Sequence, residues 1–185
     1  EAVLSPDGKR AAFLKDWNLW VRDVSTGADR QLTADGVKDF GYATDNAGWK
    51  HSDHAIVIWS PDSKKVATFQ QDQRAVADFT TTTTQIGHAR TDTWKYPFVG
   101  DKDIIHIQRV IVDVDNAKVI RLKMPADLHR SSLCDDVVCG EGPQDMQWSK
   151  DSKTLAFVST SRDHKKETVR IADATTGAVR DVFNE

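Results

Sequence analysis

A short hairpin motif that occurs three times along the chain is the strongest constraint on its fold. The three copies begin at Ser5, Ser60 and Ser149, and each is followed by an apolar segment. Their sequences are Ser-Pro-Asp-Gly-Lys, Ser-Pro-Asp-Ser-Lys and Ser-Lys-Asp-Ser-Lys, and Trp59 and Trp148 stand directly before the second and third copies. Proline, aspartate, glycine and serine favour tight turns, and the apolar segments have the composition of strands. We therefore predict a β-hairpin at each copy.

A second element follows each copy and has its own pattern. Apolar and polar residues alternate as in a strand in residues 19–28, 111–119 and 169–178, and each segment then reaches a polar turn that contains glycine or asparagine. Another strand is expected after that turn. Two hairpins per repeat make a four-stranded antiparallel unit, which is the blade of a β-propeller.

The repeats predict one all-β domain, a partial β-propeller of about three four-stranded antiparallel blades. The chain of 185 residues is too short for two large domains, and it has no apolar stripe of helical period that would support a long helix. The third copy follows the second at a far longer interval than the propeller period of about 40 to 50 residues, so the middle blade carries an insertion. The predicted blades are residues 1–35, 55–124 and 144–185, and the predicted irregular insertions are residues 36–54, 71–103 and 125–143.

Five consecutive threonines, Thr80 to Thr84, lie in the predicted insertion of the middle blade. Threonine is branched at Cβ, which stiffens its side chain and suits the surface of a pleated strand. A low-complexity loop is the alternative. We favour the strand.

Three blades cannot close a ring, so the strands at both ends of the array need a cover. We therefore expect the sequence to be a fragment of a larger propeller, whose further blades or a partner chain cover these edges. Self-association of the fragment by edge pairing or blade exchange is the corresponding hypothesis for the chain alone.

The charge pattern and the lengths of the apolar runs bear on two kinds of partner, nucleic acids and membranes. Charged residues make up 29% of the chain, the formal net charge is −3, and the two signs are mixed along the sequence. This distribution predicts no nucleic-acid surface. No apolar run approaches the roughly 18 residues that a membrane helix needs, so we expect no membrane span in this segment.

The two cysteines, Cys134 and Cys139, lie in one polar stretch. There is no Cys-x-x-Cys pair and no second cysteine cluster, so we predict no metal site and no cofactor. The two thiols can close a short-loop disulfide, which would fit an oxidising compartment, or they can stay free. The sequence leaves both alternatives open.

Several motifs occur in an order that resembles a known family. They are Ser5 to Lys9, Asp16 to Asp23, Arg30 to Thr33, Trp59 to Lys64, and the Trp-Lys-Tyr-Pro-Phe segment from Trp94 to Phe98. Together they resemble the N-terminal propeller of dipeptidyl-peptidase-IV-like serine peptidases, within the prolyl oligopeptidase superfamily. The resemblance covers essentially the whole chain.

The resemblance implies a propeller joined to a C-terminal α/β-hydrolase domain that carries a Ser-Asp-His triad. This chain contains no G-x-S-x-G nucleophile motif, so we expect no catalytic residue in it. The implied function is to gate and orient peptide substrates for the hydrolase domain, and the implied location is periplasmic or secreted. The alternative is a TolB-like propeller that serves as an interaction scaffold without peptidase activity.

The resemblance also directs attention to the stretch before the second hairpin. In the family, a pair of glutamates there binds the free α-amino group of the substrate, whereas residues 39–49 of this chain contain no glutamate. Asp45 and Asn46 are the candidates to bind that amine, with an Asx turn as the alternative. Trp49 and Trp94 are candidates to line a substrate surface, and packing in the core is the alternative for these and the other tryptophans.

Overall fold

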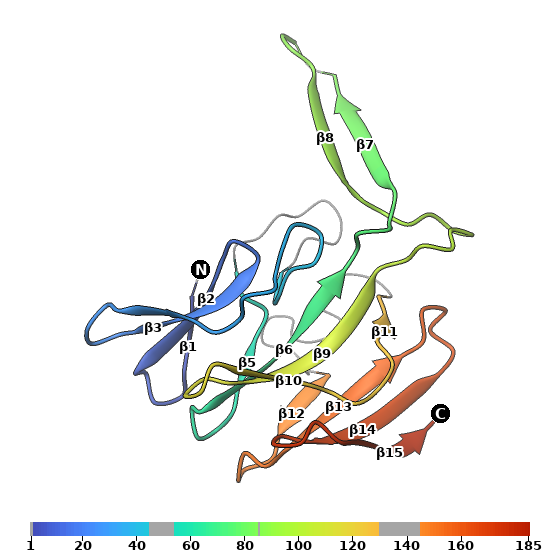
Figure 1. The fold of residues 1–185 in the computed structure, drawn as a ribbon. Coiled ribbons are helices and arrows are strands. Elements are labelled where there is room, and N and C mark those ends of the chain that lie inside the picture. The colour runs from blue at the N-terminus through green and yellow to red at the C-terminus, as the bar shows by residue number, and fades with distance from the viewer. Residues whose placement is uncertain (1, 45–53, 85, 130–144) are drawn as a thin grey trace.

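The computed structural model describes residues 2–44, 54–84, 86–129 and 145–185, which form strands, turns and connecting segments. Three antiparallel sheets stand side by side, and a two-stranded hairpin projects away from the middle sheet (Figure 1). The all-β prediction is confirmed. Within the described ranges, no helix has the length and apolar character that crossing a membrane requires.

The first and third sheets, here blade 1 and blade 3, each contain four strands in chain order. Blade 1 consists of β1 (Val3–Leu4), β2 (Arg10–Lys15), β3 (Asn18–Asp23) and β4 (Asp29–Gln31). Blade 3 consists of β12 (Met146–Trp148), β13 (Thr154–Thr160), β14 (Glu167–Asp173) and β15 (Val179–Asn184). The hairpin motif supplies the turn between the first two strands of each blade.

Blade 2 is the middle sheet, and its strand order is β10-β9-β6-β5. It consists of β5 (Ile58–Trp59), β6 (Lys65–Asp72), β9 (His106–Asp113) and β10 (Lys118–Arg121), and β11 (Asp127–Leu128) also pairs with β9. Strands β6 and β9 pair continuously from Lys65 opposite Asp113 to Asp72 opposite His106. The chain between them therefore leaves the sheet and returns without disturbing it.

The inserted segment forms the projecting hairpin of β7 (Asp78–Thr83) and β8 (Arg90–Lys95). Thr80 to Thr83 lie in β7, which confirms the strand prediction for the threonine run. The segment predicted as an irregular insertion at residues 71–103 is thus partly regular. The reason is that β-branched threonines pair across the two strands, as in the hydrogen bond of 2.9 Å between the hydroxyls of Thr80 and Thr93.

The apolar cores lie between the blades. Side chains alternate along a strand, so β9 faces both neighbours: Val110 and Val112 join the core with blade 1, and Ile107 and Ile111 join the core with blade 3. All four side chains are buried. Blade 2 is therefore covered by apolar contacts on both of its faces.

A tryptophan at the start of each following blade forms a hydrogen bond with the blade before it. The indole Nε1 of Trp59 donates to the carbonyl of Val3 at 3.0 Å, and Nε1 of Trp148 donates to the carbonyl of Ile58 at 3.1 Å. Both indole rings are buried, with 8% exposure. Both junctions between blades thus contain a hydrogen bond from an indole N–H to the carbonyl of the residue two positions before the serine of the preceding hairpin motif.

A serine in each following hairpin turn adds a second repeated contact. Ser63 Oγ accepts from the backbone N–H of Asp7, and Ser152 Oγ accepts from that of Asp62, both at 3.1 Å. The two serines adopt left-handed backbone conformations, with φ near 60°. Glycine, Gly8, takes this place in the first copy, so the first turn has no such hydroxyl.

These contacts align the blades. Because the hairpin turns of successive blades lie next to one another, β2, β6 and β13 begin at one end of the array and finish at the other. We refer to the end where they finish as the loop end. It carries the β2–β3 turn, the β7–β8 hairpin and the β13–β14 turn, and Figure 1 shows the hairpin leaving the array there.

We predict that Trp148→Phe lowers the free energy of unfolding by about 1–3 kcal/mol, because the partly buried carbonyl of Ile58 loses its donor. Urea denaturation of the chain measures this loss. Trp20→Phe is the matched control, since the buried Nε1 of Trp20 has no hydrogen-bond partner in the described structure. An equal loss in both variants would show that the repeated hydrogen bond contributes nothing.

Acid should destabilise the chain through its turn aspartates. Hydrogen bonds from the Ser25 hydroxyl and from Thr26 lower the pKa of Asp23 to about 2. The pKa of an aspartate in an unfolded chain is about 3.9. The stabilisation that ionised Asp23 contributes to the fold is therefore complete above that pH and is lost as the pH falls toward 2. The pKa of Asp173, at the equivalent turn of blade 3, is lowered by the same kinds of bonds from Thr176 and Thr175.

We therefore expect the urea midpoint to be lower at pH 3 than at pH 6. The double variant Asp23→Asn and Asp173→Asn keeps an acceptor in each turn but cannot ionise, so its midpoint should change less between the two pH values. A pH dependence identical to that of the original chain would contradict this explanation.

Candidate functional site

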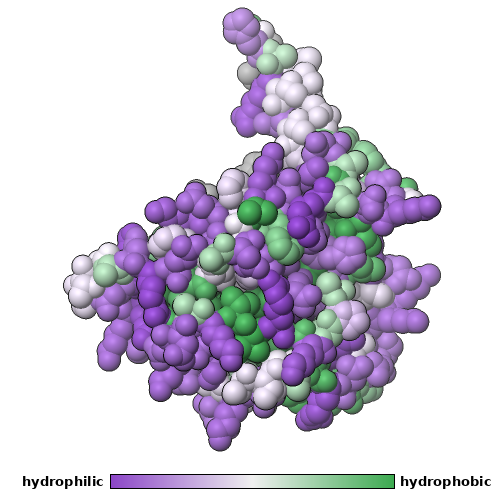
Figure 2. Space-filling model, in the orientation of Figure 1, coloured by the Kyte–Doolittle hydropathy of each residue, from purple (hydrophilic) through white to green (hydrophobic). Residues whose placement is uncertain are grey.

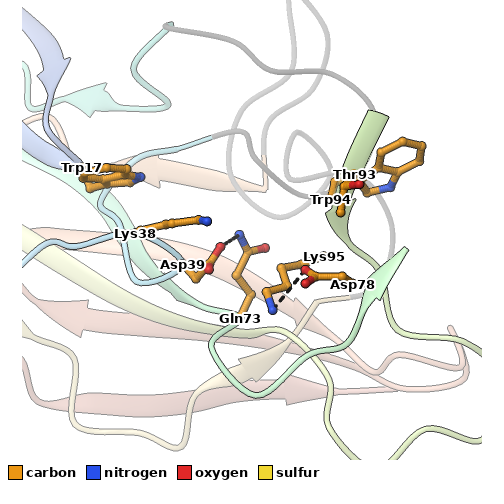
Figure 3. Close-up of a pocket in the computed structure, with 8 residues that line it drawn as sticks. All are labelled: Trp17, Lys38, Asp39, Gln73, Asp78, Thr93, Trp94 and Lys95. Carbon is orange, nitrogen blue, oxygen red and sulfur yellow. Dashed lines mark hydrogen bonds and ion pairs between the residues drawn. The ribbon is translucent and has the colours of Figure 1, made fainter. Parts of the chain in front are cut away.

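A cavity of about 400 Å³ opens at the loop end, where blade 1 meets the base of the β7–β8 hairpin (Figure 3). The indole rings of Trp17 and Trp94 lie on opposite sides of it, with polar side chains between them. We name it the two-tryptophan pocket. Its lining residues are Trp17, Lys38, Asp39, Gln73, Asp78, Thr93, Trp94 and Lys95.

The turn between β2 and β3 brings Trp17 to the pocket. Lys15 pairs with Asn18, which leaves a loop of two residues, Asp16 and Trp17, with φ values of 51° and 60°. Positive φ at both positions characterises a type I′ turn, which matches the twist of the flanking strands. The Trp17 side chain points out of the sheet, and the residue is 43% exposed.

The buried side-chain amide of Asn18 fixes this turn against the loop after β4. Its Nδ2 donates to the carbonyls of Asp16 and Gly36, and its Oδ1 accepts from the backbone N–H of Gly36 and the hydroxyl of Thr33. A Cβ at Gly36 would lie 2.2 Å from the carbonyl oxygen of Trp17. Only glycine allows this close approach, which sets the position of the Trp17 wall.

The loop of residues 36–44 supplies the floor of the pocket. Asp39 lies in a tight turn with a φ of 63°, closed by a bridge between Val37 and Phe40. Gln73 donates its backbone N–H to the Asp39 carbonyl at 3.0 Å and its Nε2 to Asp39 Oδ1 at 3.1 Å. Gln73 is buried, so this amide and carboxylate form a fixed polar pair.

The base of the hairpin forms the opposite wall. Asp78 and Lys95 are the first pair of β7 and β8, and Lys95 Nζ lies 3.2 Å from Asp78 Oδ1. The next pair is Phe79 and Trp94, whose rings meet edge to face with centroids 5.3 Å apart. The structure therefore places Trp94, a residue predicted from the sequence, on the pocket wall.

Further aromatic rings hold this wall. Phe79 also contacts Phe98, with ring centroids 5.4 Å apart, and Tyr96, at 5.7 Å. Tyr96 and Phe98 are each about half exposed. Figure 2 shows apolar surface at the base of the hairpin, next to hydrophilic side chains. The cluster gives Trp94 a rigid support.

A polar network beside the pocket joins the same loop to blade 2. Nη2 of Arg121 donates to Asp35, to the Tyr42 hydroxyl and to Gln70, at 2.9, 3.0 and 2.7 Å. Tyr42 donates to Asp35 at 2.7 Å. Burial raises the pKa of Tyr42, and the hydrogen bond to Asp35 raises it further, so the hydroxyl stays protonated. The network holds residues 36–44 in place against β6.

The lining residues offer several kinds of group to a ligand. They include two indoles, one amide, two carboxylates and two ammonium groups, but no serine, cysteine or histidine that could act as a nucleophile and its base. Within the described ranges, no group of three or more histidine, cysteine, aspartate or glutamate side chains could hold a metal ion. Balanced charges and aromatic walls fit a polar ligand with apolar side chains, such as a peptide.

Five other residues predicted from the sequence lie outside the described residues. They are Asp45, Asn46, Trp49, Cys134 and Cys139. Their proposed contacts and the redox state of the two cysteines stay predictions.

Trp17 is one of the lining residues that were not predicted from the sequence. Packing between blades holds for Trp59 and Trp148 but is wrong for Trp17, because a central residue of a two-residue turn points away from the sheet. The strand-like segments on both sides of Asp16 and Trp17 could have indicated a two-residue hairpin turn at this position. Asp39, Gln73 and Asp78 meet only through tertiary contacts, which no local pattern reveals.

Comparisons with known proteins identify the family of the chain. Residues 1–185 match the family described as "Dipeptidyl peptidase IV (DPP IV) N-terminal region". Dipeptidyl-aminopeptidase B of Aspergillus niger is 31% identical over 81 residues, which cover 42% of this chain and 9% of that protein. The chain thus matches only a small part of this curated relative.

Two solved structures have the same fold. Dipeptidyl peptidase 4 of Porphyromonas gingivalis superimposes with a TM-score of 0.70 at 16% identity, covering 100% of this chain and 25% of that one. A structure from Bacteroides ovatus gives the same TM-score and identity and covers 100% and 24%. The chain spans about a quarter of each structure, and at this identity the likeness shows the fold alone. With the family match over its whole length, the chain belongs to the dipeptidyl peptidase IV N-terminal region family.

Proposed function

We propose that this chain is the propeller region that gates and orients peptide substrates for a C-terminal α/β-hydrolase domain of a serine peptidase. The observation that carries the proposal is the two-tryptophan pocket, a cavity with indole rings on opposite sides and a fixed amide–carboxylate pair between them. Membership of the family supports the peptidase context. The chain then contributes to substrate binding and leaves bond cleavage to the hydrolase domain.

The pocket offers separate groups to the parts of a peptide. The indoles of Trp17 and Trp94 provide flat apolar faces for a side chain. Gln73 and Asp39 present an amide and a carboxylate that can hydrogen-bond to peptide groups. Lys38 is exposed and forms no ion pair with another described residue, so its ammonium group is available to a ligand carbonyl or carboxylate.

Trp17→Ala in the full-length protein should raise KM for peptide substrates roughly tenfold and leave kcat nearly unchanged. The reason is that the indole contributes binding that is equal in the ground state and the transition state. Steady-state kinetics measure the change. Val24→Ala is the control, since Val24 is an exposed apolar residue in the turn at the opposite end of blade 1. A fall in kcat with unchanged KM would contradict a binding role.

The second test concerns the peptide N-terminus. We expect the full-length protein to cleave Xaa-Pro chromogenic substrates with a free amine faster than their N-acetylated forms, because a carboxylate near the pocket pairs with the ammonium group. Asp45 and Asn46 are our candidates for this contact. Among the described residues, Asp39 is the candidate, because its carboxylate lines the pocket. Asp45→Asn should reduce the preference for the free amine.

Other outcomes identify the alternatives. Cleavage of blocked peptides alone would show that no carboxylate in this region selects a free amine. Cleavage of neither substrate form by the full-length protein would favour the alternative function, a TolB-like interaction scaffold without peptidase activity.

A further inference from the structure

A second cavity, of about 290 Å³, opens at the loop end where blade 2 meets blade 3. It lies between β11 and the ends of β13 and β14 that join at their common turn. It shares no lining residue with the two-tryptophan pocket. We name it the β11 pocket. Its charged lining residues are Asp127, Arg162, Lys166 and Arg170.

The carboxylate of Asp127 is already compensated from inside the protein. Its Oδ2 accepts from Nε of Arg109 at 2.6 Å and from the Ser159 hydroxyl at 3.0 Å. Arg109 is 1% exposed, donates also to the carbonyl of Val158, and stacks over the ring of Phe157. Asp127 therefore forms a fixed wall of the pocket whose charge is balanced by Arg109.

One of the three lining cations also has acidic partners. Nε of Arg170 donates to Asp181 at 3.0 Å, and its Nη1 lies 3.9 Å from Asp127 Oδ1. Arg170 thus closes the pocket but adds little uncompensated charge. The acids of this hairpin do not line the pocket: Asp163 accepts from the Ser161 hydroxyl, and Glu167 accepts from the Thr160 hydroxyl.

Arg162 and Lys166 are the two lining cations without an acidic partner in the described structure. The guanidinium group of Arg162 is held in the wall, because Nη1 donates to the carbonyl of His129 at 2.7 Å. Its other N–H groups remain available to a ligand. Lys166 extends from the opposite side of the same turn with a free ammonium group. Two positive charges therefore border a preformed cavity.

The neighbouring hydroxyls do not supply further donors. Those of Ser159, Thr160, Ser161 and Thr168 donate to Asp127, Glu167, Asp163 and Asn184, respectively. Recognition in the pocket therefore depends on Arg162 and Lys166. Groups of this kind bind oxyanions through charge-assisted hydrogen bonds.

We propose that the β11 pocket binds a carboxylate carried by a peptide, such as a glutamate side chain. The guanidinium group of Arg162 and the ammonium group of Lys166 can each donate a charge-assisted hydrogen bond to one carboxylate. This site is independent of peptidase activity, so it can be tested by direct binding to the chain.

The test is a nuclear magnetic resonance titration of the chain with N-acetyl-glutamate amide, which follows the side-chain signals of arginine and lysine. We expect saturable shifts of the Arg162 and Lys166 signals, weaker binding at high salt, and no such shifts with N-acetyl-glutamine amide. Lys166→Gln should weaken binding by about tenfold, the effect of losing one charge-assisted hydrogen bond. Lys166 is exposed, so this variant should fold normally, which a thermal melt verifies.

Lys165→Gln is the matched control on the same turn, because Lys165 does not line the pocket and its Nζ lies 4.0 Å from Asp163. This variant should bind like the original chain. Equal weakening by both lysine variants, or equal shifts with the glutamine compound, would overturn the proposal. Tighter binding of inorganic phosphate than of N-acetyl-glutamate amide would overturn the assignment to a carboxylate.

Discussion

The hydrogen bond from a buried tryptophan to the preceding blade fixes the arrangement on which the rest of the structure depends. Apolar packing between sheets is not directional, so two sheets covered with valine and isoleucine could slide against each other. A buried indole N–H without an acceptor would be costly, which leaves one favourable register. Trp59 and Trp148 impose the same register twice, and the turn serines Ser63 and Ser152 reinforce it.

This register determines where binding surfaces form. Each junction between blades is filled with apolar side chains, and each opens into a cavity at the loop end. There the strands have finished, and their connections differ from blade to blade. The loop of residues 36–44 lines the first cavity, and β11 lines the second. Repeated strands therefore give a constant scaffold, while the connections give each cavity its own chemistry.

The sequence predicted the parts of the fold that local patterns specify. Turn residues at Ser5, Ser60 and Ser149 and alternation in the following segments were enough for the sheets, because hairpins need only neighbouring residues. The pocket floor was not predictable in this way, since Asp39 and Gln73 meet through a loop that adds to the edge of β6. Trp94 was identified as a candidate from its segment, but its position opposite a second indole required the tertiary structure.

The two cavities differ in how their buried charges are balanced, and this difference bears on their ligands. Beside the first cavity, Arg121 is shared among a carboxylate, a phenol and an amide, so no excess charge reaches the pocket. Behind the second, Arg109 forms a buried ion pair with Asp127, with Arg109 Nε 2.6 Å from Asp127 Oδ2. A buried ion pair of this kind gains little net stability over apolar packing. Its effect here is to pair the one acid that lines the pocket, whereas Arg162 and Lys166 have no acidic partner among the described residues.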